Sequence, residues 1–148
     1  NRDREEGFIQ VLKQQGQRVS LREQGDYSYE SGCAAARRLI QNENPPDAIF
    51  CANDLMAMGA MDVARHEFNL SIPDDLSVIG FDDIPMTQWP SYGLTTIREP
   101  FSPMVDATID VLMRAIEMPD AEAEMRWISP SLIERASTRP DKRNPKES

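Results

Sequence analysis

The segment AIFCANDLMAMGAM, residues 48–61, decides the fold, because an apolar run of strand length ends at Asn53-Asp54 and a stretch rich in Met, Ala and Gly follows. The run at residues 48–52 lacks polar alternation, which is typical of a strand covered on both faces. Residues 54–67 predict a helix that begins directly after this strand. A strand that leads into a helix in this way predicts an α/β protein, and two polar residues stand at the junction.

The rest of the chain repeats this alternation of helix and strand. Apolar periodicity predicts further helices over residues 4–15, 29–42 and 102–117. Strands are predicted over residues 18–23, 76–81 and 94–99, a loop over 82–93, and an extended segment over 124–135. The order predicts a layered α/β fold with a mainly parallel sheet flanked by helices. In the last helix, the side chains expected to face inward are Met104, Ile109, Leu112, Met113 and Ile116.

Composition limits the function classes. The chain has 148 residues, 40% of them hydrophobic, and a net charge of −9, so the chain itself should repel nucleic acid. No apolar run is long enough to span a bilayer. Cys33 and Cys51 lack metal-ligand spacing, which favours buried thiols in a reducing cytosol. The chain begins at Asn1 without an initiator Met or a signal peptide, and we interpret it as a piece of a longer protein.

Four residues are candidates for a ligand site. Asn53 and Asp82 each follow a predicted strand, and the carboxyl ends of parallel strands share one margin of a sheet, where ligands bind. Tyr27 lies in a strand-to-helix loop that should reach the same margin. Arg4 begins a helix, where the helix dipole disfavours a cation, so we expect it to pair with Asp82 or to hold a polar ligand. Arginine, amide, carboxylate and aromatic groups together suit a polyhydroxylated molecule.

Each candidate also has a purely structural interpretation. Asn53 or Asp54 can cap the following helix, or Asp54 can cap it while Asn53 faces the ligand. Asp82 and Asp83 can shape the turn before Ile84-Pro85. Tyr27 can pack in its loop, and Arg4 can be a solvated surface charge. His66 fits the C-terminal end of a helix better than a site. The methionines that fit core filling are Met56, Met58 and Met61.

The sequence offers little support for a catalytic site. It contains no GxGxxG, no GxxxxGK[ST] and no HExxH pattern. The carboxylates of Asp54, Asp82 and Asp83 could hold Mg²⁺, as in a phospho-accepting receiver domain. That chemistry needs a lysine at a strand end, and no lysine lies between Lys13 and Lys142. We therefore expect no enzymatic activity, no metal site and no cofactor.

Four segments carry a family resemblance. RDREEGF (2–8), PDAIFCANDLMAMGAM (46–61), IPDDLSVIGFDD (72–83) and LTTIREP (94–100) follow one another in the order seen in the lactose- and galactose-repressor family of bacterial transcription regulators. The chain resembles the effector-binding domain of that family over about residues 2–117. The order and spacing of the four segments make the set specific.

The resemblance implies the C-terminal lobe of a periplasmic-binding-protein-like fold, in which two α/β lobes hold an effector between them. It implies that Arg4, Tyr27, Asn53 and Asp82 contact the effector, a sugar or sugar acid. It also implies a cytoplasmic homodimeric repressor that contacts operator DNA only through a helix-turn-helix headpiece absent from this chain. A nucleobase effector stays open, because Tyr27 could stack on a planar ring.

The resemblance also divides the chain. Residues 1–93 correspond to the C-terminal lobe, and residues 94–123 to a crossover and a helix that belong to the other, missing lobe. Residues 124–136 return as an extended segment, and residues 137–148 are expected to be a flexible tail. The helix at 102–117 should therefore lack the sheet that its apolar face covers in the family.

Two other classes remain as alternatives. An extracytoplasmic sugar-binding protein of a transporter shares the two-lobed fold. A metal-dependent or phospho-accepting α/β domain is the more distant alternative.

Overall fold

A four-stranded sheet organises the chain in the computed structural model, which describes residues 2–120 and 122–140. The strand order is β1-β2-β3-β4, with the first three strands parallel and the last antiparallel to its neighbour. The strands are β1 (Ala48–Phe50), β2 (Ser77–Phe81), β3 (Thr95–Arg98) and β4 (Ser131–Ile133). The predicted fold class, a layered α/β fold with a mainly parallel sheet, is confirmed.

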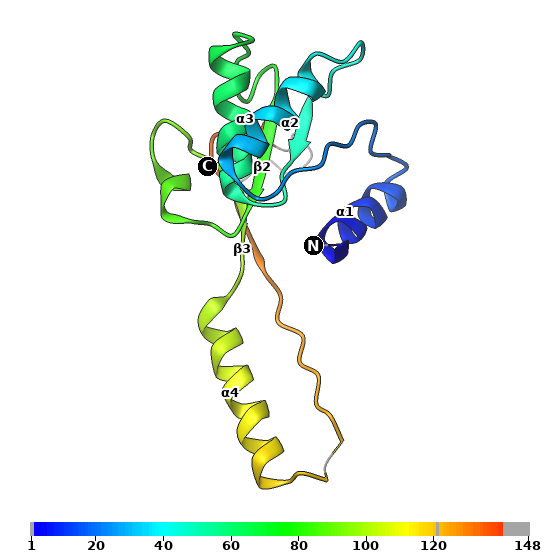
Figure 1. Ribbon diagram of the computed structural model, residues 1–148, viewed down its shortest axis with the longest axis vertical. Coiled ribbons are helices and arrows are strands. Elements are labelled where there is room, and N and C mark those ends of the chain that lie inside the picture. The colour runs from blue at the N-terminus through cyan, green and yellow to red at the C-terminus, as the bar shows by residue number, and fades with distance from the viewer. Residues whose placement is uncertain (1, 121, 141–148) are drawn as a thin grey trace.

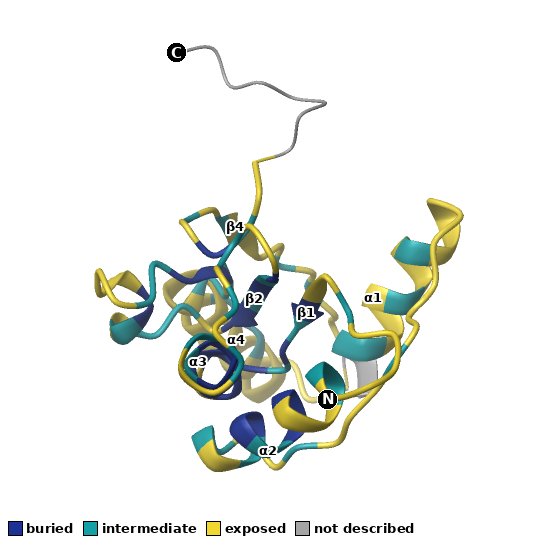
Figure 2. Cartoon of the chain, turned by 90° about the horizontal axis from the view of Figure 1, so that it is seen from above, coloured by how far each residue is buried: buried dark blue, intermediate teal, exposed yellow. Residues whose placement is uncertain are grey.

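Two helices cover the sheet and supply most of the core. Helix α2 (Tyr29–Ile40) begins at Ser28, whose hydroxyl accepts the N–H of Ser31 at 3.1 Å. Helix α3 (Asp54–His66) is buried on most sides, as Figure 2 shows. The two helices approach closely because Gly59 has no side chain, and a Cβ there would lie 2.4 Å from the carbonyl oxygen of Tyr29.

The core lies between these two helices and the sheet. Its methionines and alanines fill the space that the close helix packing leaves, which confirms the expectation that Met56, Met58 and Met61 are core residues. Both cysteines are buried free thiols, as expected. The buried members of the core are Cys33, Ala36, Ile49, Cys51, Met56, Ala57, Met58, Ala60, Met61, Val63, Ala64, Leu76, Val78 and Leu94.

Helix α1 (Arg2–Gln14) and the segment after it lie apart from the other helices in Figure 1. The strand predicted over residues 18–23 is wrong, because none of these described residues pairs with β1. Alternation fixes which side chains share a face, but a strand also needs backbone partners. Here Arg22 pairs with Glu5 of α1 and Glu23 pairs with Arg38 of α2, so side chains hold the segment instead.

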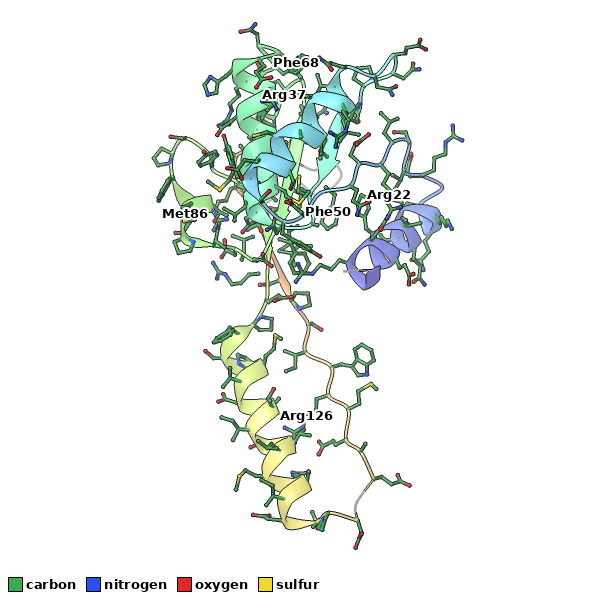
Figure 3. All side chains as sticks on the ribbon, in the orientation of Figure 1. Arg22, Arg37, Phe50, Phe68, Met86 and Arg126 are labelled. Carbon is green, nitrogen blue, oxygen red and sulfur yellow. The ribbon has the colours of Figure 1, made fainter. Side chains whose placement is uncertain are left out.

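Helix α4 (Phe101–Glu117) projects away from the sheet, and residues 122–130 return beside it (Figure 1). None of its 17 described residues is buried. The expectation that its apolar residues face inward is therefore wrong here, whereas the expectation that this face lacks a cover is confirmed. Figure 3 shows Arg126 between the helix and the returning segment, where it pairs with Asp110 at 3.2 Å and Glu124 at 2.7 Å.

The segment after β4 differs from the predicted tail at its start. Ser137 is completely buried, and its hydroxyl donates to the carbonyl oxygen of Val78 and accepts the N–H of Thr95. Residue 137 thus joins β2 to β3, and the ordered chain extends beyond the predicted boundary. Residues 141–148 of the predicted tail lie outside the described residues. Among the described residues, no helix is long and apolar enough to cross a membrane.

Candidate functional site

The four predicted site residues lie at one margin of the sheet, where β1 and β2 end. Asn53 follows β1 closely and Asp82 follows β2, whereas Tyr27 precedes α2 and Arg4 lies in the first turn of α1. Arg4 Nη1 lies 3.4 Å from Asp82 Oδ1 and donates to the carbonyl oxygen of Ala52 at 3.1 Å. Asn53 Nδ2 donates to the carbonyl oxygen of Tyr27 at 2.9 Å. The structure therefore brings all four residues together at the predicted margin.

Arg4 has tertiary partners that explain a cation at the start of a helix. Besides Asp82, its guanidinium donates to Glu99 Oε1 at 3.0 Å and lies 3.8 Å from the ring centroid of Phe81. The ring face attracts the cation and orients the guanidinium plane. Its side chain keeps 30% of its surface exposed. A guanidinium has five N–H donors, so these three acceptors leave capacity for a ligand oxygen.

Asn53 is the N-cap of α3. Its Oδ1 accepts the N–H of Met56 at 3.0 Å while its amide nitrogen holds the Tyr27 carbonyl. The alternative in which Asp54 caps the helix is therefore wrong. An amide offers four hydrogen-bonding sites and two are engaged here, so Asn53 can cap the helix and still contact a ligand.

Asp54 is instead a buried link beneath the margin. Its Oδ1 accepts the hydroxyl of Thr96 at 2.6 Å, and its Oδ2 accepts the N–H of Ile84 at 2.9 Å. Burial raises the pKa of this carboxyl above its usual range, although the two hydrogen bonds oppose the rise. A Cβ at Gly80 would lie 2.1 Å from Asp54 Oδ1, so the carboxylate needs glycine there. Asp54 thus joins α3, β3 and the loop after β2.

The turn at Asp82-Asp83 presents its two carboxylates to different partners. Both residues have positive φ angles, 111° and 56°, a region that non-glycine residues rarely occupy. Asp82 faces Arg4, and burial raises the pKa of its carboxyl while the arginine charge opposes the rise. Asp83 faces Arg98 and Arg135, at 2.5 Å and 2.7 Å. The predicted turn-shaping role and the placement of Asp82 at the margin therefore coexist.

A groove of about 1030 Å³ lies beside this margin, between α1, residues 17–25 and the face formed by β1 and α2. Arg4 and Tyr27 line this groove, but Asn53 and Asp82 are not among its lining residues. The groove exists because residues 17–25 do not pair with β1. We therefore place the candidate site at the margin where the polar groups converge, rather than in the groove.

Three features that shape the site were not predicted from the sequence. They are the contacts of Phe81 and Glu99 with Arg4, and the burial of Asp83 as a hydrogen-bond acceptor. Glu99 directly follows β3, and β3 runs parallel to β2, so its position at the same margin could have been inferred. The contact of Phe81 with Arg4 had no signal, because it depends on where α1 packs. Among the described residues, no group of three His, Cys, Asp or Glu side chains could hold a metal ion.

The comparison with known proteins decides the family. A family model described as the periplasmic binding protein-like domain matches residues 1–138. The chain belongs to this family. Within it, the HTH-type transcriptional repressor PurR of Klebsiella pneumoniae is 35% identical over 135 residues, which cover 88% of this chain and 39% of the relative. The chain thus spans about two fifths of the length of the curated relatives it matches.

Solved structures of this family agree with the fold described above. The Lac repressor bound to ONPG superposes with a TM-score of 0.83 at 29% identity, over 93% of this chain and 41% of that one. The transcriptional regulator CelR in complex with cellobiose superposes with a TM-score of 0.80 at 28% identity, over 88% and 40%. These likenesses confirm the resemblance to the lactose- and galactose-repressor family and the periplasmic-binding-protein-like architecture.

Proposed function

We propose that this chain is the effector-sensing part of a bacterial transcription regulator, and that it holds a sugar or sugar acid at the sheet margin. The observation that carries this proposal is the convergence of Arg4 and Asp82, 3.4 Å apart, beside the Asn53 amide. A cation, a carboxylate and an amide in reach of one another offer both donors and acceptors to vicinal hydroxyl groups. Tyr27, 42% exposed, supplies a face for the C–H side of a sugar ring.

The named relatives support this function. PurR is named a transcriptional repressor, and the solved relatives include a Lac repressor with ONPG and CelR with cellobiose. The net charge of −9 suits a part held away from DNA. We propose that operator binding uses a helix-turn-helix headpiece outside these residues, that the regulator is a cytoplasmic homodimer, and that it catalyses no reaction.

The chain contributes one wall of the effector cleft. We propose that residues 1–93 form the C-terminal lobe, and that residues 94–123 extend into a second lobe whose remaining residues lie outside this chain. A ligand that contacts only one wall loses part of its binding energy, because one face of it stays in water. We therefore expect the 148-residue chain to bind sugars weakly.

Saturation-transfer NMR with the 148-residue chain tests this function. The probes are cellobiose, glucose, galactose, gluconate and glucuronate, each at millimolar concentration, with hypoxanthine to represent nucleobases. We expect signal from at least one sugar or sugar acid, and expect Asp82→Ala to remove it, because the carboxylate accepts hydroxyl protons and holds Arg4.

The matched control is Asp75→Ala, since Asp75 accepts the Ser71 N–H in a turn that contributes no residue to the site. That variant should keep the sugar signal. Signal from hypoxanthine alone would contradict the sugar assignment. Sugar signal that survives Asp82→Ala would contradict the assigned site.

A further inference from the structure

Asp83 is a buried carboxylate at the edge of an otherwise exposed turn. Only 3% of its side-chain surface is accessible, although Asp82 beside it keeps 36%. Both of its oxygens are occupied: Oδ1 accepts from Arg135 at 2.7 Å and from Thr87 at 3.1 Å, and Oδ2 accepts from Arg98 at 2.5 Å. Asp83 therefore presents no free oxygen to the candidate effector site.

The two arginines lie at β3 and just after β4, the two neighbouring strands between which the chain forms α4. Arg98 is the last residue of β3, from which the chain enters α4, and Arg135 follows β4, on which the chain returns. Strands β3 and β4 are antiparallel neighbours, so they form a two-stranded ribbon. Arg135 also donates to the carbonyl oxygen of Leu94 at 2.7 Å, just before β3. Asp83 therefore binds both ends of this ribbon.

The backbone at Asp83 also determines where Asp82 lies. Two successive residues with positive φ require surrounding contacts to hold them, because each is costly for a residue with a side chain. On one side, the N–H of Asp82 donates to the carbonyl oxygen of Ile97 in β3 at 2.9 Å. On the other side, the Asp83 carboxylate is held by charge-assisted hydrogen bonds, the stronger class.

We propose that Asp83 is a positioning residue: it holds Asp82 against Arg4 and ties the effector turn to the β3–β4 ribbon that leads to α4. This inference rests on the proposed function for its biological meaning. Asp83 contacts no ligand in this account. The Asp83 side chain binds Arg98 and Arg135 of the ribbon, and its backbone is joined to Asp82. The position of the Asp82 carboxylate is therefore coupled to the ribbon.

The electrostatics agree with this role. Burial works against ionisation of Asp83, but the hydrogen bonds from Arg135, Arg98 and Thr87 outweigh it and lower the pKa of the carboxyl. The group therefore stays ionised at neutral pH. A neutral amide at this position would keep the shape but lose the charge that both guanidiniums bind.

Amide hydrogen exchange of the 148-residue chain tests the tie without a ligand. The variant is Asp83→Asn, read at two amides: Asp82, bonded to the Ile97 carbonyl, and Arg135, bonded to the Thr95 hydroxyl at 2.9 Å. We expect both amides to exchange at least about tenfold faster, which is the scale of losing one hydrogen bond to a charged group. Amides of α3 exchange only through global unfolding, so they report how far the substitution lowers the overall free energy of unfolding.

A double-mutant cycle with Arg135→Gln separates this tie from general loosening. If the two groups act through one contact, the double variant exchanges about as fast as either single variant. Multiplied effects, or unchanged rates at Asp82 and Arg135, overturn the proposal. The control variant Asp75→Asn should change neither amide.

A sugar-binding measurement keeps the two proposals distinguishable. With the sugar found in the panel, Asp83→Asn should weaken binding several-fold while Asp82→Ala abolishes it. Binding that depends on Asp82 but not on Asp83 overturns the positioning role and leaves the proposed function standing. Altered exchange at both amides in a chain that binds no sugar supports the tie and contradicts the proposed function.

Discussion

Helices α3 and α4 are both rich in apolar residues, yet they end in opposite environments. Nine of the 13 residues of α3 are buried, whereas none of the 17 residues of α4 is. The helix α3 packs against α2 and β2, and the apolar side chains of α4 face solvent. An apolar pattern is therefore enough to predict a helix. Burial of that helix depends on a partner surface that other residues must supply.

The largest expected effect lies in α3. Met61 is completely buried, so Met61→Ala should lower the free energy of unfolding by about 3 kcal/mol through lost contacts and a cavity. Urea denaturation of the 148-residue chain, followed by circular dichroism, measures this. A loss below about 1 kcal/mol would show that the core around α3 is loosely packed.

A somewhat smaller loss is expected where β2 passes α3. In Gly80→Ala the new Cβ would lie 2.1 Å from Asp54 Oδ1 and push the carboxylate away from the Thr96 hydroxyl. We expect about 2 kcal/mol of destabilisation, the usual scale of overpacking. The matched control is Gly7→Ala in α1, where a Cβ meets nothing within 4 Å. Equal stability of the two variants would contradict the close packing at Asp54.

A pH-dependent difference is expected at Asp54. Burial, together with the charges of Asp82 and Asp83, raises the pKa of this carboxyl above its value in the unfolded chain. A raised folded-state pKa means that stability from this group is present at low pH and is lost as pH rises through that pKa. The unfolding free energy of Asp54→Asn, relative to the unchanged chain, should therefore increase between about pH 4 and pH 7. A decrease over that range would reverse the sign assigned to burial.

The smallest effect is expected in α4. Met113 is 49% exposed, so Met113→Ala should change the free energy of unfolding by less than about 0.5 kcal/mol. The same substitution in α3 costs several times more, which makes the pair a direct comparison of the two helices. A loss as large as that of Met61→Ala would show that another molecule covers α4, and analytical ultracentrifugation would then reveal a dimer.

Much of this arrangement could be predicted from the sequence because strand and helix signals are local. The apolar run before Asn53 and the one before Asp82 placed two side chains at one margin, since parallel strands end together. The segment at residues 18–23 could not be predicted, because its alternation gives no information about backbone partners. The cap at Asn53 rather than Asp54 was ambiguous, because either side chain can accept an N–H near the helix start.

Contacts between segments distant in the sequence were the other feature that could not be predicted. The burial of Ser137 depends on the segment after β4 reaching both Val78 of β2 and Thr95 of β3, which no local pattern reveals. Asp83 resembled an ordinary turn residue, and its role emerged only when Arg98 and Arg135 were placed beside it. The exposed face of α4 was expected from the family resemblance, whereas the periodicity of that helix alone predicted burial.

Residues 1–93 are proposed to form a folded lobe that holds the effector margin, while α4 stays outside its core. Amide hydrogen exchange of the 148-residue chain, resolved by residue, tests this most directly. We expect the central amides of α3 and β2 to exchange only through global unfolding, and those of α4 to exchange at least about a hundredfold faster. Equal protection of α3 and α4 would contradict the account, because it would mean that α4 belongs to the same cooperative core.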